Sequence, residues 1–179
     1  SILCDVRNEE KVISLIKSIN PNIIINCIGI LIKGANINPQ NAIYLNSYFP
    51  HLLMNLSDSI NAKLIHISTD CVFSGEKEMP YIEKDLKDGK DTYAKTKGLG
   101  EIINENHLTL RTSVIGPELK TDGEELFHWF MCQTGKINGF TKAIWSGVTT
   151  LVLAKVVLWA IEDKITGLYH VTNNKSIDK

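Results

Sequence analysis

The sequence predicts an α/β fold built on a doubly wound parallel sheet, followed by a small C-terminal lobe. Helix-like and strand-like segments alternate with short connections from residue 9 to about residue 111, an order typical of helices layered on a parallel sheet. The strand-like segments are short, apolar and rich in β-branched residues, as expected of strands covered on both faces. After Gly116 and Pro117 the pattern becomes irregular, which indicates a second lobe.

Hydrophobic periodicity and helix-stop signals locate the elements of the first part. Apolar residues recur at helical spacing, Asn20 and Pro21 end the first helix, and Pro50 predicts a kink in the second. Cys27 and Cys71 are assigned to apolar strand runs, so both are expected to be buried free thiols. The expected elements are a helix at residues 9–19, a strand at 23–28, a helix at 40–56 and a strand at 64–67.

The rest of the chain contains a charged loop, further helices and strands, and the irregular lobe. Residues 76–91 are polar and carry both signs of charge around Pro80 and Gly89, which predicts a solvated loop. The elements expected after this loop are a helix at residues 91–105, a strand at 108–111, a helix at 150–162 and a strand at 168–171.

The composition excludes several classes of protein. Nineteen Lys and Arg residues balance twenty Asp and Glu residues, and the resulting net charge of −1 argues against nucleic acid or an anionic membrane as a partner. No apolar run approaches the roughly 20 residues of a membrane-spanning helix. The four cysteines and five histidines lack metal-ligand spacing, so no metal site is predicted and the histidines are expected at the surface or at strand ends. Unpaired cysteines favour a reducing cytoplasm.

Ligands of an open α/β sheet bind beyond the carboxyl ends of its strands, which are expected here at residues 28–30, 68–70 and 111–113. Near these ends, Tyr93 and Lys97 lie one turn apart on one predicted helix. An ammonium roughly 4 Å from a phenol favours the phenolate, and such a tyrosine can exchange a proton with a substrate near pH 7. Taken alone, this spacing is more often that of a solvated helix face.

The sequence around Tyr93 and Lys97 resembles that of a known group of proteins. Ser68-Thr69-Asp70 ends a predicted strand, and its hydroxyls can hold a substrate oxygen beside the phenol of Tyr93. A strand-end Ser or Thr, a charged loop and then Tyr-x-x-x-Lys resembles the short-chain dehydrogenase/reductase superfamily. Three further segments are similar to it: Asp5-Val6, which would meet the adenine ring, Asn26-Cys27-Ile28-Gly29, which would form the turn beside the cofactor, and Asn46 on the following helix.

Within this superfamily the chain is most similar to the dTDP-4-dehydrorhamnose reductase family. These enzymes reduce the 4-keto group of a nucleotide-activated deoxysugar with a nicotinamide cofactor. The segments that carry this similarity are residues 68–75, 81–85, 93–97 with Gly100-Glu101, 111–113 and 145–150.

The resemblance implies a domain organisation. Residues 1–112 would be the C-terminal part of an incomplete, Rossmann-like dinucleotide-binding domain. Residues 113–179 would be mostly a substrate-binding lobe, whose helix and strand could return to the main sheet. The sequence contains no glycine-rich phosphate-binding turn, so we expect the first βαβ unit of the fold to be missing and the choice between NAD and NADP stays open.

The resemblance also implies a role for each matching residue. Tyr93 would donate a proton to the sugar C4 oxygen, Lys97 would hold the cofactor ribose and lower the pKa of Tyr93, and Thr69, helped by Asp70, would bind the carbonyl oxygen. The residues implied in binding NADP or NAD are Asp5, Val6, Cys27, Ile28, Gly29, Asn46, Ser68, Tyr93, Lys97, Thr112 and Ser113. Those implied in binding the nucleotide sugar are Thr69, Asp70, Phe73, Trp145 and Thr149.

Two departures and two alternatives accompany this interpretation. Residues 28–34 lack the family's Ala-rich turn, and Val114 stands where an aromatic residue is usual, so the sugar could differ. One alternative is a nucleotide-sugar epimerase or dehydratase of the same superfamily. The other is a non-catalytic regulatory or binding subunit with this fold. A cytoplasmic enzyme of cell-surface polysaccharide synthesis, able to form a homodimer, is the leading expectation.

Overall fold

A computed structural model describes residues 1–118, 123 and 125–178. The chain divides into two compact units, one formed by Ser1–Arg111 with Ile165–Tyr169 and the other by Thr112–Lys164 with His170–Lys179. In the part of the chain that is described, no helix has the length and apolar character needed to cross a membrane.

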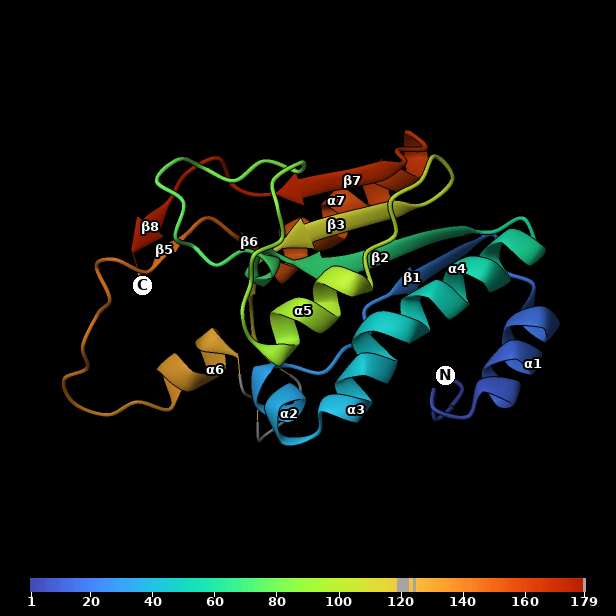
Figure 1. Cartoon of the computed structure of the whole chain (residues 1–179), viewed down its shortest axis with the longest axis horizontal. Coiled ribbons are helices and arrows are strands. Elements are labelled where there is room, and N and C mark those ends of the chain that lie inside the picture. Colours follow the sequence, from blue (N-terminus) through green and yellow to red (C-terminus); the bar gives the residue numbers. More distant parts are fainter. Residues whose placement is uncertain (119–122, 124, 179) are drawn as a thin grey trace. The chain divides into compact units, whose positions relative to one another are not determined.

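The first unit is built on a parallel four-stranded sheet in the order β1-β2-β3-β7 (Figure 1). Ile23 of β1 pairs with Lys63 of β2, and this register continues to the pair of Asn26 and His66. The predicted α/β fold with a parallel sheet is confirmed. The strands are β1 (Ile23–Asn26), β2 (Lys63–Thr69), β3 (Leu108–Thr112) and β7 (Gly167–Val171).

β1 differs from the prediction in length and in burial. It ends at Asn26, and Ile25 within it is 46% exposed, although both faces of the strand were expected to be covered. β1 lies at one end of the strand order, where fewer neighbours surround each side chain. Its carboxyl end nevertheless shares one edge of the sheet with those of β2 and β3, because all three strands are parallel.

The helices begin and end at residues with identifiable capping roles. Asn8 caps the first helix by accepting a hydrogen bond from the Lys11 N–H, and Asn20 ends it in a left-handed conformation. Pro50 lies in the first turn of α4, where its missing N–H costs nothing, and the π-helix η1 precedes it instead of a kink. The helices of this unit are α1 (Glu9–Ile19), α2 (Ile32–Ile37), α3 (Pro39–Ala42), η1 (Ile43–Tyr48), α4 (Phe49–Ser59), η2 (Asp70–Val72, a 3₁₀ turn) and α5 (Thr92–Leu99).

The main core lies between α1, α4 and β2. Apolar side chains at helical spacing on α1 and α4 meet Leu64, which is fully buried on β2. The buried members of this core are Val12, Phe49, Leu52, Leu53, Leu56, Leu64 and Ile102.

α5 is shorter than predicted. It ends at Leu99, and the prediction of helix as far as residue 105 is wrong beyond that point. Gly100 follows as the cap, and a Cβ atom there would overlap the carbonyl oxygen of Asn46. The chain then turns inward, so that Glu101 and Ile102 are buried.

The expectations for cysteine and histidine burial are wrong at four positions. Cys27 and Cys71 are exposed, because Cys27 lies just beyond β1 and Cys71 lies in the turn η2 after β2. His66 and His107 are buried, with 0% and 1% of their surfaces exposed. Both histidines have side-chain or backbone partners in the sheet region, which the local sequence pattern does not report.

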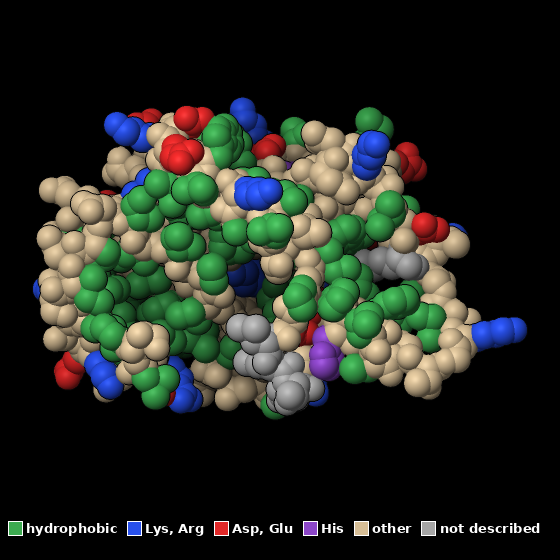
Figure 2. All heavy atoms as spheres, turned by 180° about the vertical axis from the view of Figure 1, so that it is seen from behind, with side chains coloured by type: hydrophobic (Ala, Val, Ile, Leu, Met, Phe, Trp, Pro, Cys, Tyr) green, Lys and Arg blue, Asp and Glu red, His purple; other side chains and the backbone are tan. Residues whose placement is uncertain are grey.

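The described residues of the second unit form two small sheets and two helices. Parallel β4 (Val114–Ile115) and β6 (Val148–Thr149) form one sheet, and antiparallel β5 (Ile144–Trp145) and β8 (Ile177–Asp178) form the other. The helices are α6 (Leu126–Met131) and α7 (Thr150–Glu162). α7 exposes Leu151, Leu158 and Trp159, and Figure 2 shows apolar side chains spread over the face turned away from the viewer in Figure 1.

Candidate active site

Thr69 ends β2 with its hydroxyl held between backbone and carboxylate. The side-chain oxygen accepts a hydrogen bond from the Cys71 N–H at 3.2 Å and donates one to Asp70 Oδ1 at 3.4 Å. Thr69 is 7% exposed, whereas Asp70 is exposed at the start of the 3₁₀ turn. The strand end therefore presents a fixed hydroxyl with a carboxylate beside it.

Lys97 connects α5 to the same end of β2 through a hydrogen bond. Its ammonium donates a hydrogen bond of 2.8 Å to the carbonyl oxygen of Ile67, two residues before Thr69. Tyr93, one turn earlier on α5, is 9% exposed and packs against Ala35 and Ala42. The Asp91 carboxylate caps the helix through the Ala94 N–H at 2.8 Å, which fixes the turn that carries Tyr93.

Burial changes the acidity of the groups in this region. Lys97 is 5% exposed, and desolvation lowers its pKa from 10.5 to about 8, while the negative charge of Glu101 and the thiol of Cys27 oppose the shift. Burial raises the pKa of Cys27, with the charge of Lys97 acting in the opposite direction. The two side chains are thus electrostatic neighbours, although they come from different elements.

A network of amides shapes the turn after β1. Asn26 is buried, its Nδ2 lies 3.1 Å from His66 Nδ1, and its Oδ1 accepts a hydrogen bond from the Ile28 N–H at 3.1 Å. Burial, followed by the charges of Lys97 and His51, holds the pKa of His66 well below 6.5. Neutral His66, through its contact with Asn26, therefore stabilises the turn that carries the predicted cofactor residues.

Asn46 joins this turn to α5. Its amide makes paired hydrogen bonds with the Ile30 backbone, of 2.8 Å from the N–H and 3.0 Å to the carbonyl, and donates to Thr96 Oγ1 at 3.2 Å. A Cβ atom on Gly29 would lie 3.2 Å from Asn46 Oδ1 and 3.9 Å from Lys97 Nζ. Gly29, Asn46 and Lys97 therefore lie close together at the sheet edge. Asn46 lies on the π-helix η1, a structure frequently found at functional sites.

A buried ion network lies behind the strand ends, and Ser68 is the one predicted site residue among the members named here. The Arg111 guanidinium binds both carboxylate oxygens of Glu101, at 2.7 and 2.8 Å, and Ser68 donates to Glu101 Oε1 at 2.8 Å. Burial alone would raise the pKa of Glu101, but these hydrogen bonds and the charges of Arg111 and Lys87 lower it below its usual value. The feature of the sequence that could have indicated this network is Arg111, a charged residue at the end of a buried strand.

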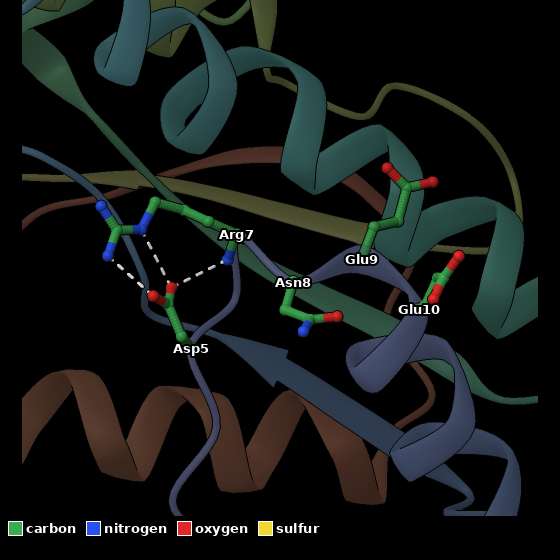
Figure 3. A pocket seen from close by; sticks show the side chains of 5 residues that line it. All are labelled: Asp5, Arg7, Asn8, Glu9 and Glu10. Carbon is green, nitrogen blue, oxygen red and sulfur yellow. Dashed lines mark hydrogen bonds and ion pairs between the residues drawn. The ribbon is translucent and has the colours of Figure 1, made fainter.

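Asp5 and Val6 lie apart from this cluster, before α1. The Asp5 carboxylate receives hydrogen bonds from the Arg7 side chain and backbone, at 2.7 to 3.0 Å, and these lower its pKa to about 2 (Figure 3). Val6 accepts a hydrogen bond from the Tyr44 hydroxyl at 3.2 Å through its carbonyl. An open depression at this place is lined by Asp5, Arg7, Asn8, Glu9 and Glu10.

The remaining predicted residues have structural partners. In the second unit, Thr112 donates to the Val171 carbonyl at 3.1 Å, and Trp145 Nε1 donates to Ser113 Oγ at 2.7 Å. Thr149 caps α7 by accepting from the Val152 N–H at 3.2 Å. In the first unit, the Phe73 ring stacks on Tyr81 with centroids 4.3 Å apart. Their roles toward cofactor or sugar stay predictions.

The structure therefore places one group of the predicted residues on elements that pack together, and the other predicted residues lie elsewhere. Lys97 binds the backbone of β2 two residues before Thr69, so α5 with Tyr93 packs on the strand that ends in Ser68 and Thr69. Cys27, Ile28 and Gly29 form the turn after β1, and Gly29 lies close to Asn46 of η1 and to Lys97. In the described residues, no group of three or more His, Cys, Asp or Glu side chains is arranged to hold a metal ion.

Comparison with known proteins identifies the family. A family model described as the RmlD substrate binding domain matches residues 2–179. The chain belongs to this family. It is 32% identical over 114 residues to the dTDP-4-dehydrorhamnose reductase of Escherichia coli (strain K12), an alignment that covers 61% of this chain and 38% of that protein. The resemblance to dTDP-4-dehydrorhamnose reductases is confirmed.

Solved structures of this RmlD-related group have the same fold. The dTDP-4-dehydrorhamnose reductase of Clostridium acetobutylicum matches with a TM-score of 0.86 and 26% identity, over 97% of this chain and 64% of that one. The enzyme of Bacillus anthracis, solved in complex with NADP, matches with a TM-score of 0.85 and 25% identity, over 98% and 65%. The chain thus spans less than two thirds of the length of these relatives.

Proposed function

We propose that the protein reduces the 4-keto group of a nucleotide-activated deoxysugar with NADPH or NADH, as a step of cell-surface polysaccharide synthesis. One observation carries this proposal: the hydrogen bond from Lys97 to the Ile67 carbonyl ties α5, the helix of Tyr93 and Lys97, to the end of β2, the strand of Thr69. Membership of a family whose named relatives include dTDP-4-dehydrorhamnose reductases supports the choice of substrate.

The residues at the sheet edge suit a nicotinamide cofactor. Gly29 brings the backbone of the turn close to Asn46 and the Lys97 ammonium, and a Cβ atom there would contact both. Lys97, largely protonated at pH 7 because its pKa is about 8, can donate hydrogen bonds to ribose hydroxyls. Bound in this place, the cofactor would supply the hydride for the reduction.

The chain's own residues supply the proton and the orientation of the ketone. The Thr69 hydroxyl, which directs its single proton to Asp70 in this structure, would turn that proton to the carbonyl oxygen and stabilise the negative charge that develops there. Asp70 would stay beside the hydroxyl and help to orient it. The Tyr93 hydroxyl would give its proton to the same oxygen. The positive charge of Lys97 would stabilise the phenolate left behind.

Replacing Tyr93 by Phe tests this assignment, because it removes the proton donor and keeps the packing against Ala35 and Ala42. In protein expressed from its complete reading frame, we expect kcat with a 4-keto sugar nucleotide to fall roughly 10²- to 10⁴-fold. Tyr48→Phe is a matched control, because the Tyr48 hydroxyl is bound to Glu9 on the surface. Turnover of Tyr93→Phe within a few-fold of that control would refute the catalytic role.

The same assay separates reduction from the chemistry of related epimerases and dehydratases. A reductase consumes one NAD(P)H for each sugar reduced, whereas epimerisation and dehydration regenerate the cofactor. Loss of absorbance at 340 nm in proportion to product therefore supports reduction. Product formation without that loss would favour the epimerase or dehydratase alternative. A homodimer and a cytoplasmic location stay predictions, which sedimentation and cell fractionation can check.

A further inference from the structure

The Glu101 carboxylate is fully buried, which is rare for this residue unless it is paired. It has four interactions. Arg111 binds both of its oxygens, Ser68 donates to Oε1, and the Lys87 ammonium lies 3.2 Å from Oε2. These partners come from β3, β2 and the charged loop, so the carboxylate is a junction of three segments.

The connection through Ser68 leads to the candidate active site. Ser68 directly precedes Thr69 and directly follows Ile67, whose carbonyl accepts the hydrogen bond of Lys97. A displacement of Ser68 would therefore move both the Thr69 hydroxyl and the anchor of α5. Glu101 itself follows Lys97 by four residues, just beyond the cap of α5.

The connection through Arg111 reaches the charged loop. Besides its bonds to Glu101, Arg111 donates through Nη1 to the Glu83 carbonyl at 3.0 Å. Its guanidinium also lies 5.1 Å from the centre of the Phe73 ring, which stacks on Tyr81. Glu101 thus fixes the cation that binds the Glu83 carbonyl in this loop and contacts the Phe73 ring just before it.

We propose that Glu101 is a positioning residue for the proposed reduction: anchored by Arg111, it holds Ser68 and hence Thr69 in place, and it sets its buried negative charge four residues after Lys97. The inference rests on the proposed function. A fold-stabilising role alone does not require the charge, because a buried ion pair can often be replaced by apolar residues without loss of stability.

The groups that act on Lys97 predict the sign of the effect. Cys27 faces it from the turn after β1, His66 from β2, and Tyr93 lies on its own helix. Glu101 is the largest influence that raises the pKa of Lys97 against the effect of burial. Removing this charge should therefore lower the pKa of Lys97 further below about 8.

Glu101→Gln tests the role of the negative charge of Glu101. Ser68→Ala tests the role of the hydrogen bond that Ser68 of β2 donates to Glu101. Thr109→Val is the matched control, because the buried Thr109 hydroxyl binds the backbone of Ile102, the residue after Glu101, without carrying charge. The pKa of Lys97 is measured by NMR titration of protein labelled at lysine Cε, with the signal assigned from Lys97→Arg. Kinetics with the keto sugar nucleotide give kcat and KM.

We expect Glu101→Gln to lower the pKa of Lys97 by about 0.5 unit or more and kcat by about tenfold relative to Thr109→Val, with KM less affected. Ser68→Ala should lower kcat without moving that pKa. A Lys97 pKa unchanged in Glu101→Gln, or a loss of kcat no larger than in Thr109→Val, would overturn the inference. If Glu101→Gln does not fold, the comparison of kcat between Ser68→Ala and Thr109→Val decides alone.

The two readouts distinguish the failure of this inference from the failure of the proposed function. If the wild-type protein reduces no keto sugar while Glu101→Gln still shifts the Lys97 titration, the proposed function is wrong and the charge coupling holds. If the wild type is active and the titration does not shift, the coupling is wrong and the proposed function holds.

Discussion

Lys97 illustrates how the surroundings of one residue determine its chemistry. Its ammonium is buried, has a hydrogen bond to the Ile67 carbonyl, and has a pKa of about 8 instead of 10.5. It is therefore mostly charged at pH 7 but loses its proton within an experimentally accessible range. In the proposed mechanism, this loss removes both a ribose ligand and the charge that stabilises the Tyr93 phenolate.

A pH profile of the reduction tests this behaviour. We expect kcat/KM to decrease as the pH rises through about 8, because that constant reports the ionisation of the free enzyme. In Lys97→Arg the guanidinium stays charged, so whatever activity remains should lose this decrease or show it at higher pH. An alkaline limb at the same pH in Lys97→Arg would assign it to another group, such as Tyr93.

At the scale of elements, the end of α5 is set by close contact with η1. The helix stops at Gly100, where the backbone touches the Asn46 carbonyl and leaves no room for a side chain. Two residues earlier, Gly98 lies within the same helix, and the nearest atom to a Cβ there would be 3.5 Å away on Lys87. Close contact therefore requires glycine at the cap position 100, whereas the space around Gly98 would admit a Cβ atom.

Substituting these two glycines by alanine should give opposite results. Gly100→Ala forces α5 and η1 apart, and overpacking of this kind typically costs about 1–3 kcal/mol of unfolding free energy. Gly98→Ala fits in ordinary contact and should be neutral or stabilise by up to about 1 kcal/mol, because alanine favours a helix over glycine. Urea unfolding measures both changes. Equal stabilities would contradict the close approach at Gly100.

At the scale of the whole molecule, the features that could be predicted from the sequence are those that depend on local residue patterns. Apolar periodicity located α1 and α4, and continuous apolar runs located β2 and β3. The spacing of Thr69, Tyr93 and Lys97 predicted a group that α5 brings to the end of β2. These predictions depend on neighbours in sequence and on the parallel order of the strands.

What the sequence could not predict depends on long-range contact. The Glu101–Arg111 pair joins two elements through buried charges, and His66 is buried because Asn26, 40 residues away, lies beside it. The exposure of Cys27 follows from where β1 ends, a boundary that a continuous apolar run does not mark. Periodicity records which face of an element is buried, but not which polar groups will meet there.

The stability of the whole molecule should depend on pH through His66. This side chain is buried, and its Nε2 has no hydrogen-bond partner within the described residues, so charging it in the folded state is unfavourable. Its pKa is well below 6.5 when folded, whereas the unfolded chain has the ordinary value. Below pH 6.5 the unfolded state therefore binds the additional proton, and the free energy of unfolding decreases as the pH falls.

His66→Asn isolates this contribution, because asparagine offers Asn26 a polar partner but does not titrate. Between pH 7 and pH 5 the wild-type protein should lose about 1–2 kcal/mol more unfolding free energy than the variant, as measured by urea denaturation at each pH. Carboxylates with lowered pKa values, such as Glu101, also lose stability on acidification. They are present in both proteins, so the difference between the two slopes belongs to His66, and equal slopes would show that His66 binds protons alike in the folded and unfolded states.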